Sequence, residues 1–222
     1  MAPETDTPRA LRLLAAVLAA GFAVVVGHAV WGLPPEALGL TEAVGSRLDL
    51  SGVSHPVTAV LLNFRGYDTL LEVGVLLLAI ICPWSFSDLQ ASGRSEPPGP
   101  VLVALARLLL PVMVVTAGFL LWLGAQAPGG AFQAGAVLGA AGVLWQLAGG
   151  VLPAGSRTAR IVLSAGFAVF LAVAVGTMLL EGHLLQYPRA QAGGLILIIE
   201  SAATVSIGLT LAALFSVMSA AR

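Results

Sequence analysis

Two carboxylates in strongly apolar surroundings are the side chains of this sequence best suited to bind or exchange a cation. Glu72 follows Arg65 and Asp68 at spacings of seven and four residues, which on a helix places all three on one face. Arg65 and Asp68 can neutralise each other, which leaves Glu72 as the unpaired carboxylate. A charged side chain in the middle of a bilayer costs at least ~2.5–3.5 kcal/mol. We expect Glu72 to line a hydrated path; the alternative is that this stretch anchors a helix at the membrane surface.

Glu200 is the second such carboxylate, and it lies well inside a long apolar run. Its depth corresponds to roughly 12 Å along a helix axis, and neither neighbouring turn holds a basic residue. The carboxyl group must therefore be protonated, paired with another helix or subunit, or hydrated. A protonated Glu200 that only makes a structural hydrogen bond between helices is the alternative to a proton-exchanging group.

The three histidines are scattered through the sequence and form no metal-ligating pattern. His28, near the end of the first apolar run, can relay protons as a neutral imidazole. His55 and His183 are better explained as hydrogen-bonding side chains at the membrane surface. No nucleophile has a matching base, and a single Cys excludes a disulfide framework or an iron–sulfur cluster. We expect a protein that is not an enzyme and has no resident metal or cofactor.

Gly129 and Gly130 begin a glycine-rich stretch that continues with Gly135 and Gly139. The stretch lacks the Gly-Lys-Ser/Thr ending of a phosphate-binding loop, so it does not predict nucleotide binding. Small residues four positions apart let transmembrane helices approach closely. We assign all four glycines to helix packing.

The composition indicates the class of protein that positions these groups. Of the 222 residues, 58% are hydrophobic and 9% are charged, whereas about 25% are charged in a typical soluble domain. The ten basic residues, all Arg, are balanced by eleven acidic ones, which leaves no basic surface for nucleic acid. The sequence is that of an all-α integral membrane protein.

Apolar segments for about six spans are present, since one span takes about 20 residues. They are expected at 13–35, 56–86, two within 108–156, 161–180 and 193–217. A hinge at 126–130 separates the two spans within 108–156, and a Pro-rich linker lies at 87–100. With both termini in the cytoplasm, seven Arg lie inside and two outside, as the positive-inside bias favours.

Two stretches resemble motifs of one protein family. Residues 57–72, VTAVLLNFRGYDTLLE, resemble the DFRGFDTLGE motif of the Mrp-type multisubunit sodium/proton antiporters. In that family the motif lies in the C-terminal tail of the large A subunit, or in the small E subunit of related membrane-bound hydrogenases. Residues 128–135, PGGAFQAG, are similar to the PGGGFQGG of the antiporter's MrpB/MnhB-type subunit, and the last span is similar to the acidic final helix of that subunit.

The resemblance implies two modules joined through the Pro-rich linker. Residues 1–96 are similar to the two-helix tail of the A subunit, and residues 97–222 to a four-helix MrpB/MnhB-type protein. The resemblance also implies a role in the ion pathway at a subunit interface for Glu72 and for Glu200. Asn63 stands where the motif has an aspartate, which argues against a cation-ligand role there, and the hydroxyl of Tyr67 can serve instead.

We therefore expect a multi-pass subunit of a sodium/proton antiporter in a prokaryotic cell (inner) membrane. Na+ and H+ would be the transported ions, and the partners would be lipid and other antiporter subunits, of the A, C, D, E, F and G types. Na+ would bind transiently near Glu72, with oxygen ligands from Tyr67, Thr69 or a neighbouring subunit, while the Arg65–Asp68 pair sets the electrostatics. The alternatives are a subunit of a membrane-bound hydrogenase or related respiratory complex, and a purely structural assembly subunit.

Overall fold

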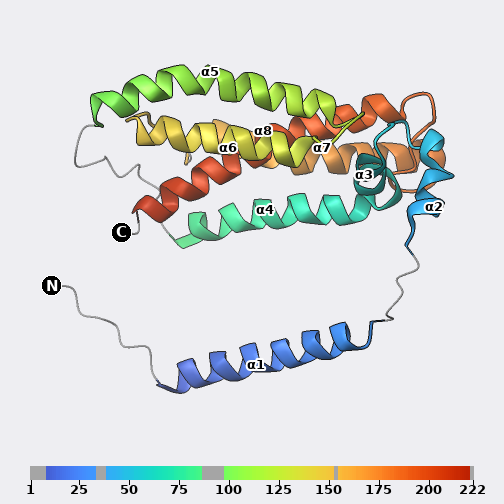
Figure 1. Cartoon of the computed structure of the whole chain (residues 1–222), viewed down its shortest axis with the longest axis horizontal. Coiled ribbons are helices and arrows are strands. Elements are labelled where there is room, and N and C mark those ends of the chain that lie inside the picture. Colours follow the sequence, from blue (N-terminus) through green and yellow to red (C-terminus); the bar gives the residue numbers. More distant parts are fainter. Residues whose placement is uncertain (1–8, 34–38, 87–97, 153–154, 221–222) are drawn as a thin grey trace. The chain divides into compact units, whose positions relative to one another are not determined.

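The computed structural model describes residues 9–33, 39–86, 98–152 and 155–220. Regular structure within these ranges is entirely helical, with no strand, which confirms the all-helical class. Residues 1–42 and 43–222 form two units (Figure 1). The predicted linker falls mostly outside the described residues, and so does the predicted module boundary at 96–97.

The unit at residues 1–42 contains one long helix, α1 (Arg9–Trp31). Its residues Leu13–Trp31 are long and apolar enough to cross a membrane. A helix that is apolar on all sides suits a lipid environment. The last residues of the predicted first span, Pro34 and Pro35, lie outside the described residues.

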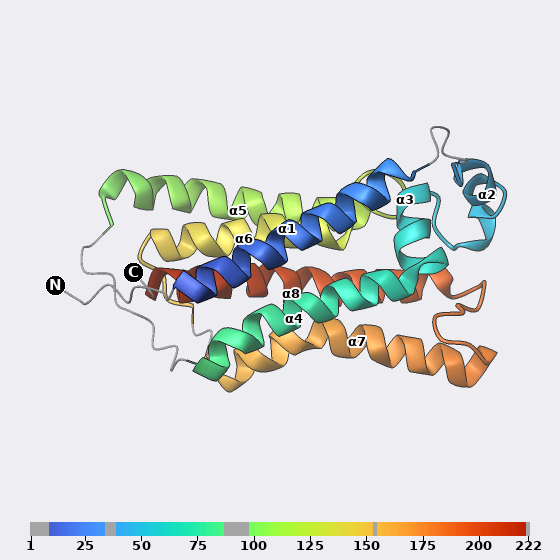
Figure 2. The ribbon, with the colours of Figure 1, turned by 90° about the horizontal axis from the view of Figure 1, so that it is seen from below.

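Five long helices make up most of the described part of the second unit, and they run alongside one another (Figures 1 and 2). They are α4 (Gly66–Phe86), α5 (Pro100–Leu123), α6 (Ala131–Leu147), α7 (Arg157–Glu181) and α8 (Ala192–Ala220). Helix α8 is central, because it packs against α6, α7 and α4, whereas α5 packs mainly against α6. Figure 2 shows α8 between α6 on one side and α4 on the other.

Four helices of the described chain are long and apolar enough to cross a membrane, judged by length and composition. They are Leu13–Trp31, Pro100–Leu123, Arg157–Glu181 and Ala192–Val217. Helix α6 is also apolar but has 17 residues, and α4 carries Asp68 and Glu72 near its start. The span count of six and the cytoplasmic position of both termini stay predictions.

Two helices occupy most of the uncharged stretch at 108–156, and α5 ends and α6 begins on either side of the Pro and Gly residues, as predicted. Helix α5 begins earlier than the predicted span, because Pro100 occupies a first-turn position where its missing N–H is tolerated. Helix α7 begins at Arg157, where the Ser156 hydroxyl oxygen accepts a hydrogen bond from the Ala159 N–H at 3.1 Å. Arg107 and Arg157 therefore lie within helices rather than between them.

Small residues bring α6 and α8 into close contact. A Cβ atom on Gly135 would lie 2.8 Å from the Ile207 Cβ and 3.2 Å from the Thr204 carbonyl oxygen. A Cβ on Gly139 would lie 2.8 Å from the Leu211 Cβ. Because no side chain fits in either gap, the two helices approach as closely as their backbones and the opposing side chains allow.

We predict that Gly135→Ala destabilises the protein by about 1–3 kcal/mol, because the added methyl group overpacks the α6–α8 contact. The measurement is the midpoint of thermal unfolding in detergent, followed by circular dichroism. Gly118→Ala in α5 is the matched control, since nothing lies within 4 Å of its Cβ position and alanine favours a helix by about 1 kcal/mol over glycine. Equal midpoints for the two variants would contradict the prediction.

Candidate functional site

The segment at 56–86 is not one continuous helix. Helix α3 (Pro56–Ala59) leads into a π-helical turn, Val60–Phe64, and the helix is interrupted at Arg65 before α4 begins. Arg65 has φ −129° and ψ 33°, outside the helical region, and its N–H donates to the Val60 carbonyl at 2.8 Å. The expectation that Arg65 shares a helical face with Asp68 and Glu72 is therefore wrong for Arg65. Short π-helical turns occur frequently at functional sites.

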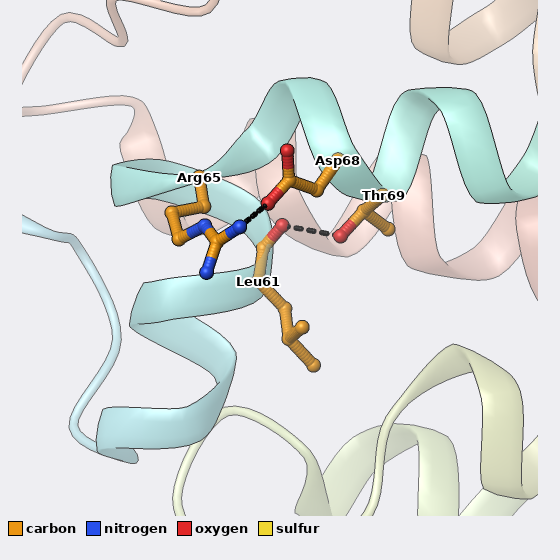
Figure 3. A network of polar contacts seen from close by, with 4 residues as sticks. All are labelled: Leu61, Arg65, Asp68 and Thr69. Atoms are coloured by element: carbon orange, nitrogen blue, oxygen red, sulfur yellow. Dashed lines mark hydrogen bonds and ion pairs between the residues drawn. The ribbon is translucent and has the colours of Figure 1, made fainter. Parts of the chain in front are cut away.

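Two contacts stabilise this interruption (Figure 3). The Thr69 hydroxyl donates to the Leu61 carbonyl, which belongs to the π-helical turn, at 2.6 Å. Arg65 forms an ion pair with Asp68 in the first turn of α4, and the two side chains are 67% and 46% exposed. A solvent-accessible ion pair contributes at most about 1 kcal/mol, so the bond from the buried Thr69 is the stronger constraint on the turn.

Glu72 lies on the exposed side of α4. Its apolar neighbours Leu71 and Val75 are 67% and 63% exposed, and within the described chain its side chain has no hydrogen bond or ion pair. The Tyr67 hydroxyl donates to the Leu184 carbonyl at 3.2 Å, and Thr69 is buried. Both hydroxyls proposed as Na+ ligands thus have hydrogen-bond acceptors of their own.

A cavity of about 190 Å³ lies between the segment at 55–73, the start of α6 and the first half of α8. Apolar side chains such as Val73, Phe170 and Ile199 form much of its lining. Five polar side chains also line it: His55, Thr58, Thr69, Gln133 and Glu200. The cavity therefore lies between the segment at 55–73, which carries the first motif, and helix α8, which is distant from that segment in sequence.

Glu200 is the buried acidic residue of this cavity, with 3% of its surface exposed. Its Oε1 accepts a hydrogen bond from the Ala131 N–H at 3.3 Å. Ala131 is the first residue of α6, so the carboxylate lies at the positive end of that helix dipole. Gly130 allows this approach, because its φ is +97° and a Cβ there would lie 2.6 Å from Oε1.

His55 lines the cavity as well, although its position next to a polar stretch suggested a surface side chain. Its backbone N–H donates to the Ala125 carbonyl at 3.1 Å, and the Thr58 hydroxyl donates to the Gly124 carbonyl at 2.5 Å. These bonds attach the start of α3 to the end of α5. The ring Nδ1 of His55 is buried and has no hydrogen-bond partner in the described part of the protein.

His28 and Gly129 are the other predicted site residues. His28 is exposed in the last turn of α1, in the other unit. Gly129 lines the cavity, and a Cβ there would lie 2.5 Å from the Leu120 carbonyl oxygen. Within the described ranges, no three or more His, Cys, Asp or Glu side chains are grouped so that they could hold a metal ion.

Comparisons with known proteins give one family and two similar solved structures. A family model described as "Domain related to MnhB subunit of Na+/H+ antiporter" matches residues 101–221. A comparison with curated proteins gives no match.

The first similar structure is a chain of the Mrp complex from Dietzia sp. DQ12-45-1b, with a TM-score of 0.63 and 22% identity. The match covers 96% of this chain and 26% of that one, so this chain spans about a quarter of the length of that relative. The second is a chain of the membrane-bound sulfane sulfur reductase, an archaeal respiratory membrane complex. Its TM-score is 0.69 at 25% identity, over 92% of this chain and 98% of that one.

We predict that Thr69→Val destabilises the protein by about 1–3 kcal/mol, since it leaves the Leu61 carbonyl without its donor. Thr69→Ser keeps the hydroxyl and is the matched control, with a smaller effect. Thermal unfolding in detergent measures both. An unchanged midpoint for Thr69→Val would show that the π-helical turn does not depend on this bond.

Proposed function

This chain belongs to the family of domains related to the MnhB subunit of the Na+/H+ antiporter, and we propose that it is a membrane subunit of a Mrp-type sodium/proton antiporter complex. The observation that carries the proposal is the buried carboxylate of Glu200, in a cavity that the family-matched residues help to form. A carboxylate within an apolar helix bundle is costly, and such residues mark ion and proton paths. The likeness in fold to a chain of the Mrp complex supports the same proposal.

Glu72 is the second acidic group of the proposed path, at a surface that a partner protein would cover. It lies six residues after the start of α4, roughly 9 Å along the helix axis. Contact of a charged side chain with lipid there is unfavourable, so a neighbouring antiporter subunit is the better environment. Asp68 offsets the charge of Arg65, which would leave the Glu72 carboxylate free to attract Na+. The further oxygen ligands would come from the neighbouring subunit or from Tyr67 and Thr69, whose hydroxyl oxygens keep lone pairs while they donate to backbone carbonyls.

In this proposal the chain is a multi-pass protein of a prokaryotic cell membrane with both termini in the cytoplasm. Its transported ions are Na+ and H+, and it needs no resident cofactor. Its partners are antiporter subunits of the A, C, D, E, F and G types, and it contributes both to the ion path and to assembly of the complex.

A subunit of an ion-translocating respiratory complex is the second candidate. The chain of the sulfane sulfur reductase is matched over 98% of its length, whereas the matched chain of the Mrp complex is much longer than this one. The same acidic residues would then serve a complex in which redox subunits drive ion movement.

Co-purification distinguishes these candidates. We expect extraction in mild detergent, followed by mass spectrometry, to identify large antiporter subunits and no metal-cluster protein. Nickel–iron or iron–sulfur subunits would favour the respiratory complex instead. A chain that purifies alone would contradict both.

We predict that Glu72→Gln lowers sodium/proton exchange by about tenfold or more while the complex still assembles, because the amide keeps the shape of the side chain and removes its charge. Exchange is measured with the purified complex in proteoliposomes. Glu42→Gln, at an exposed position in α2 (Thr41–Gly45), is the matched control and should exchange like the wild type. Wild-type exchange by an assembled Glu72→Gln complex would refute the ion-path role. Parallel losses of assembly and exchange would favour a purely structural subunit.

A further inference from the structure

We propose that the cavity around Glu200 carries protons rather than sodium ions, and that His55 exchanges a proton with Glu200 through water in this cavity. This inference rests on the proposed function and deepens it, because it assigns one of the two transported ions to one site. It also gives a role to His55, whose sequence position suggested only a surface hydrogen bond.

Glu200 and His55 are the titratable residues among those that line the cavity. The elements packed around Glu200 otherwise contribute polar or apolar side chains, such as Gln133 from α6 and Phe170 from α7. Three charged residues are close in sequence to lining residues but do not line the cavity themselves: Arg65, Asp68 and Glu72. Tyr187 belongs to the adjoining hydrophobic core, and burial raises the pKa of its phenol, which keeps it neutral.

The environment of Glu200 favours a proton over a metal cation. The Ala131 N–H and the positive end of the α6 dipole lie against Oε1 and disfavour either added cation there, so the preference for a proton comes from the ligands that each ion needs. A sodium ion must replace its hydration shell with several oxygen ligands, whereas much of this lining is apolar. A proton on the carboxylate needs no other ligand and removes the buried charge.

The cavity has the volume and the polar groups that water needs. About 190 Å³ accommodates several molecules that each take about 30 Å³ in the liquid. The side chains of Thr58, Thr69 and Gln133 provide hydrogen-bonding partners for this water.

His55 connects this water to the surface. It is partly exposed, whereas Glu200 is 3% exposed. No described group forms a hydrogen bond with its Nδ1. This nitrogen therefore does not hold the neutral ring in one tautomer.

The transfer conserves charge within the cavity. A protonated His55 gives the proton of a ring nitrogen to a cavity water, and this water gives one of its protons to the Glu200 carboxylate oxygen that Ala131 does not contact. The imidazolium becomes neutral imidazole, and the carboxylate becomes a neutral carboxylic acid. The reverse sequence returns the proton to the surface through His55.

The test uses the full chain in lipid nanodiscs and a light-released proton. Time-resolved infrared spectroscopy follows the C=O band of the protonated carboxyl group that Glu200→Gln removes. His55→Asn should slow the rise of this band by about a hundredfold, the lower range for a positioned proton-transfer group. His183→Asn, exposed in the loop after α7, is the matched control and should leave the rate unchanged.

The Asn variant is suited to this test, because the His55 side chain makes no capping hydrogen bond to α3 and asparagine is a good helix N-cap residue. Circular dichroism checks the fold, and His55→Gln provides a second variant with the same expected effect. An unchanged rate in folded His55→Asn and His55→Gln would overturn the proposal.

Replacing choline by Na+ at constant pH and ionic strength supplies the other arm of the test. The Glu200 carboxyl bands should not respond, and a shift on adding Na+ would overturn the proposal, since it would make the cavity a cation site. This readout needs no partner protein. It therefore fails or succeeds separately from the co-purification and exchange experiments that test membership of an antiporter complex.

Discussion

The hydrogen bond between the Glu200 carboxylate and the first N–H of α6 is the interaction on which the second unit depends. A polar group inside an apolar bundle has to find its partners in the protein or in enclosed water, and the N–H at the start of α6 is the protein partner of Glu200 on α8. That requirement sets how far α6 is shifted along α8, and it places Gly135 where Ile207 leaves no room for a side chain. Near the end of α6, Gln146 donates to the Ala212 carbonyl of α8 at 2.8 Å. The two helices are thus joined by polar contacts at both ends and by small residues between them.

Similar hydrogen bonds join other elements of this unit to one another. The Ser206 hydroxyl donates to the Leu163 carbonyl of α7 at 2.5 Å, and Thr58 does the same toward the end of α5. Apolar contacts between helices are much like contacts with lipid and give little preference for one arrangement. Directional hydrogen bonds to backbone carbonyls therefore contribute strongly to which helix faces pack together. In the resulting arrangement a cavity remains beside Glu200.

Features that depend on local composition were predictable from the sequence. Helical class follows from the excess of apolar residues, and the break between α5 and α6 follows from Pro128 and its neighbouring glycines. The burial of Glu200 follows from the long apolar run on either side of it.

Features that depend on contacts between distant residues were not predictable in this way. The π-helical turn is stabilised by the Thr69 hydroxyl, which donates to a carbonyl eight positions earlier. The residue types within the turn do not predict a π-helix. His55 follows a polar stretch and precedes a proline, as a surface residue would. The hydrogen bonds of this segment to Ala125 and Gly124 place the ring at the cavity. The exposure of Glu72 likewise results from which side of α4 packs against α7 and α8.

The hydrogen bonds between the start of α3 and the end of α5 connect two stretches that resemble parts of different antiporter proteins. If those stretches were separate polypeptides, the same bonds would form across an interface between two chains and would depend on how much of each partner the cell makes. On one polypeptide the two stretches are present in equal amounts, and their effective concentration toward each other is high. Unequal synthesis of the two stretches, which would leave some copies of the cavity without one of its walls, therefore does not arise for this protein.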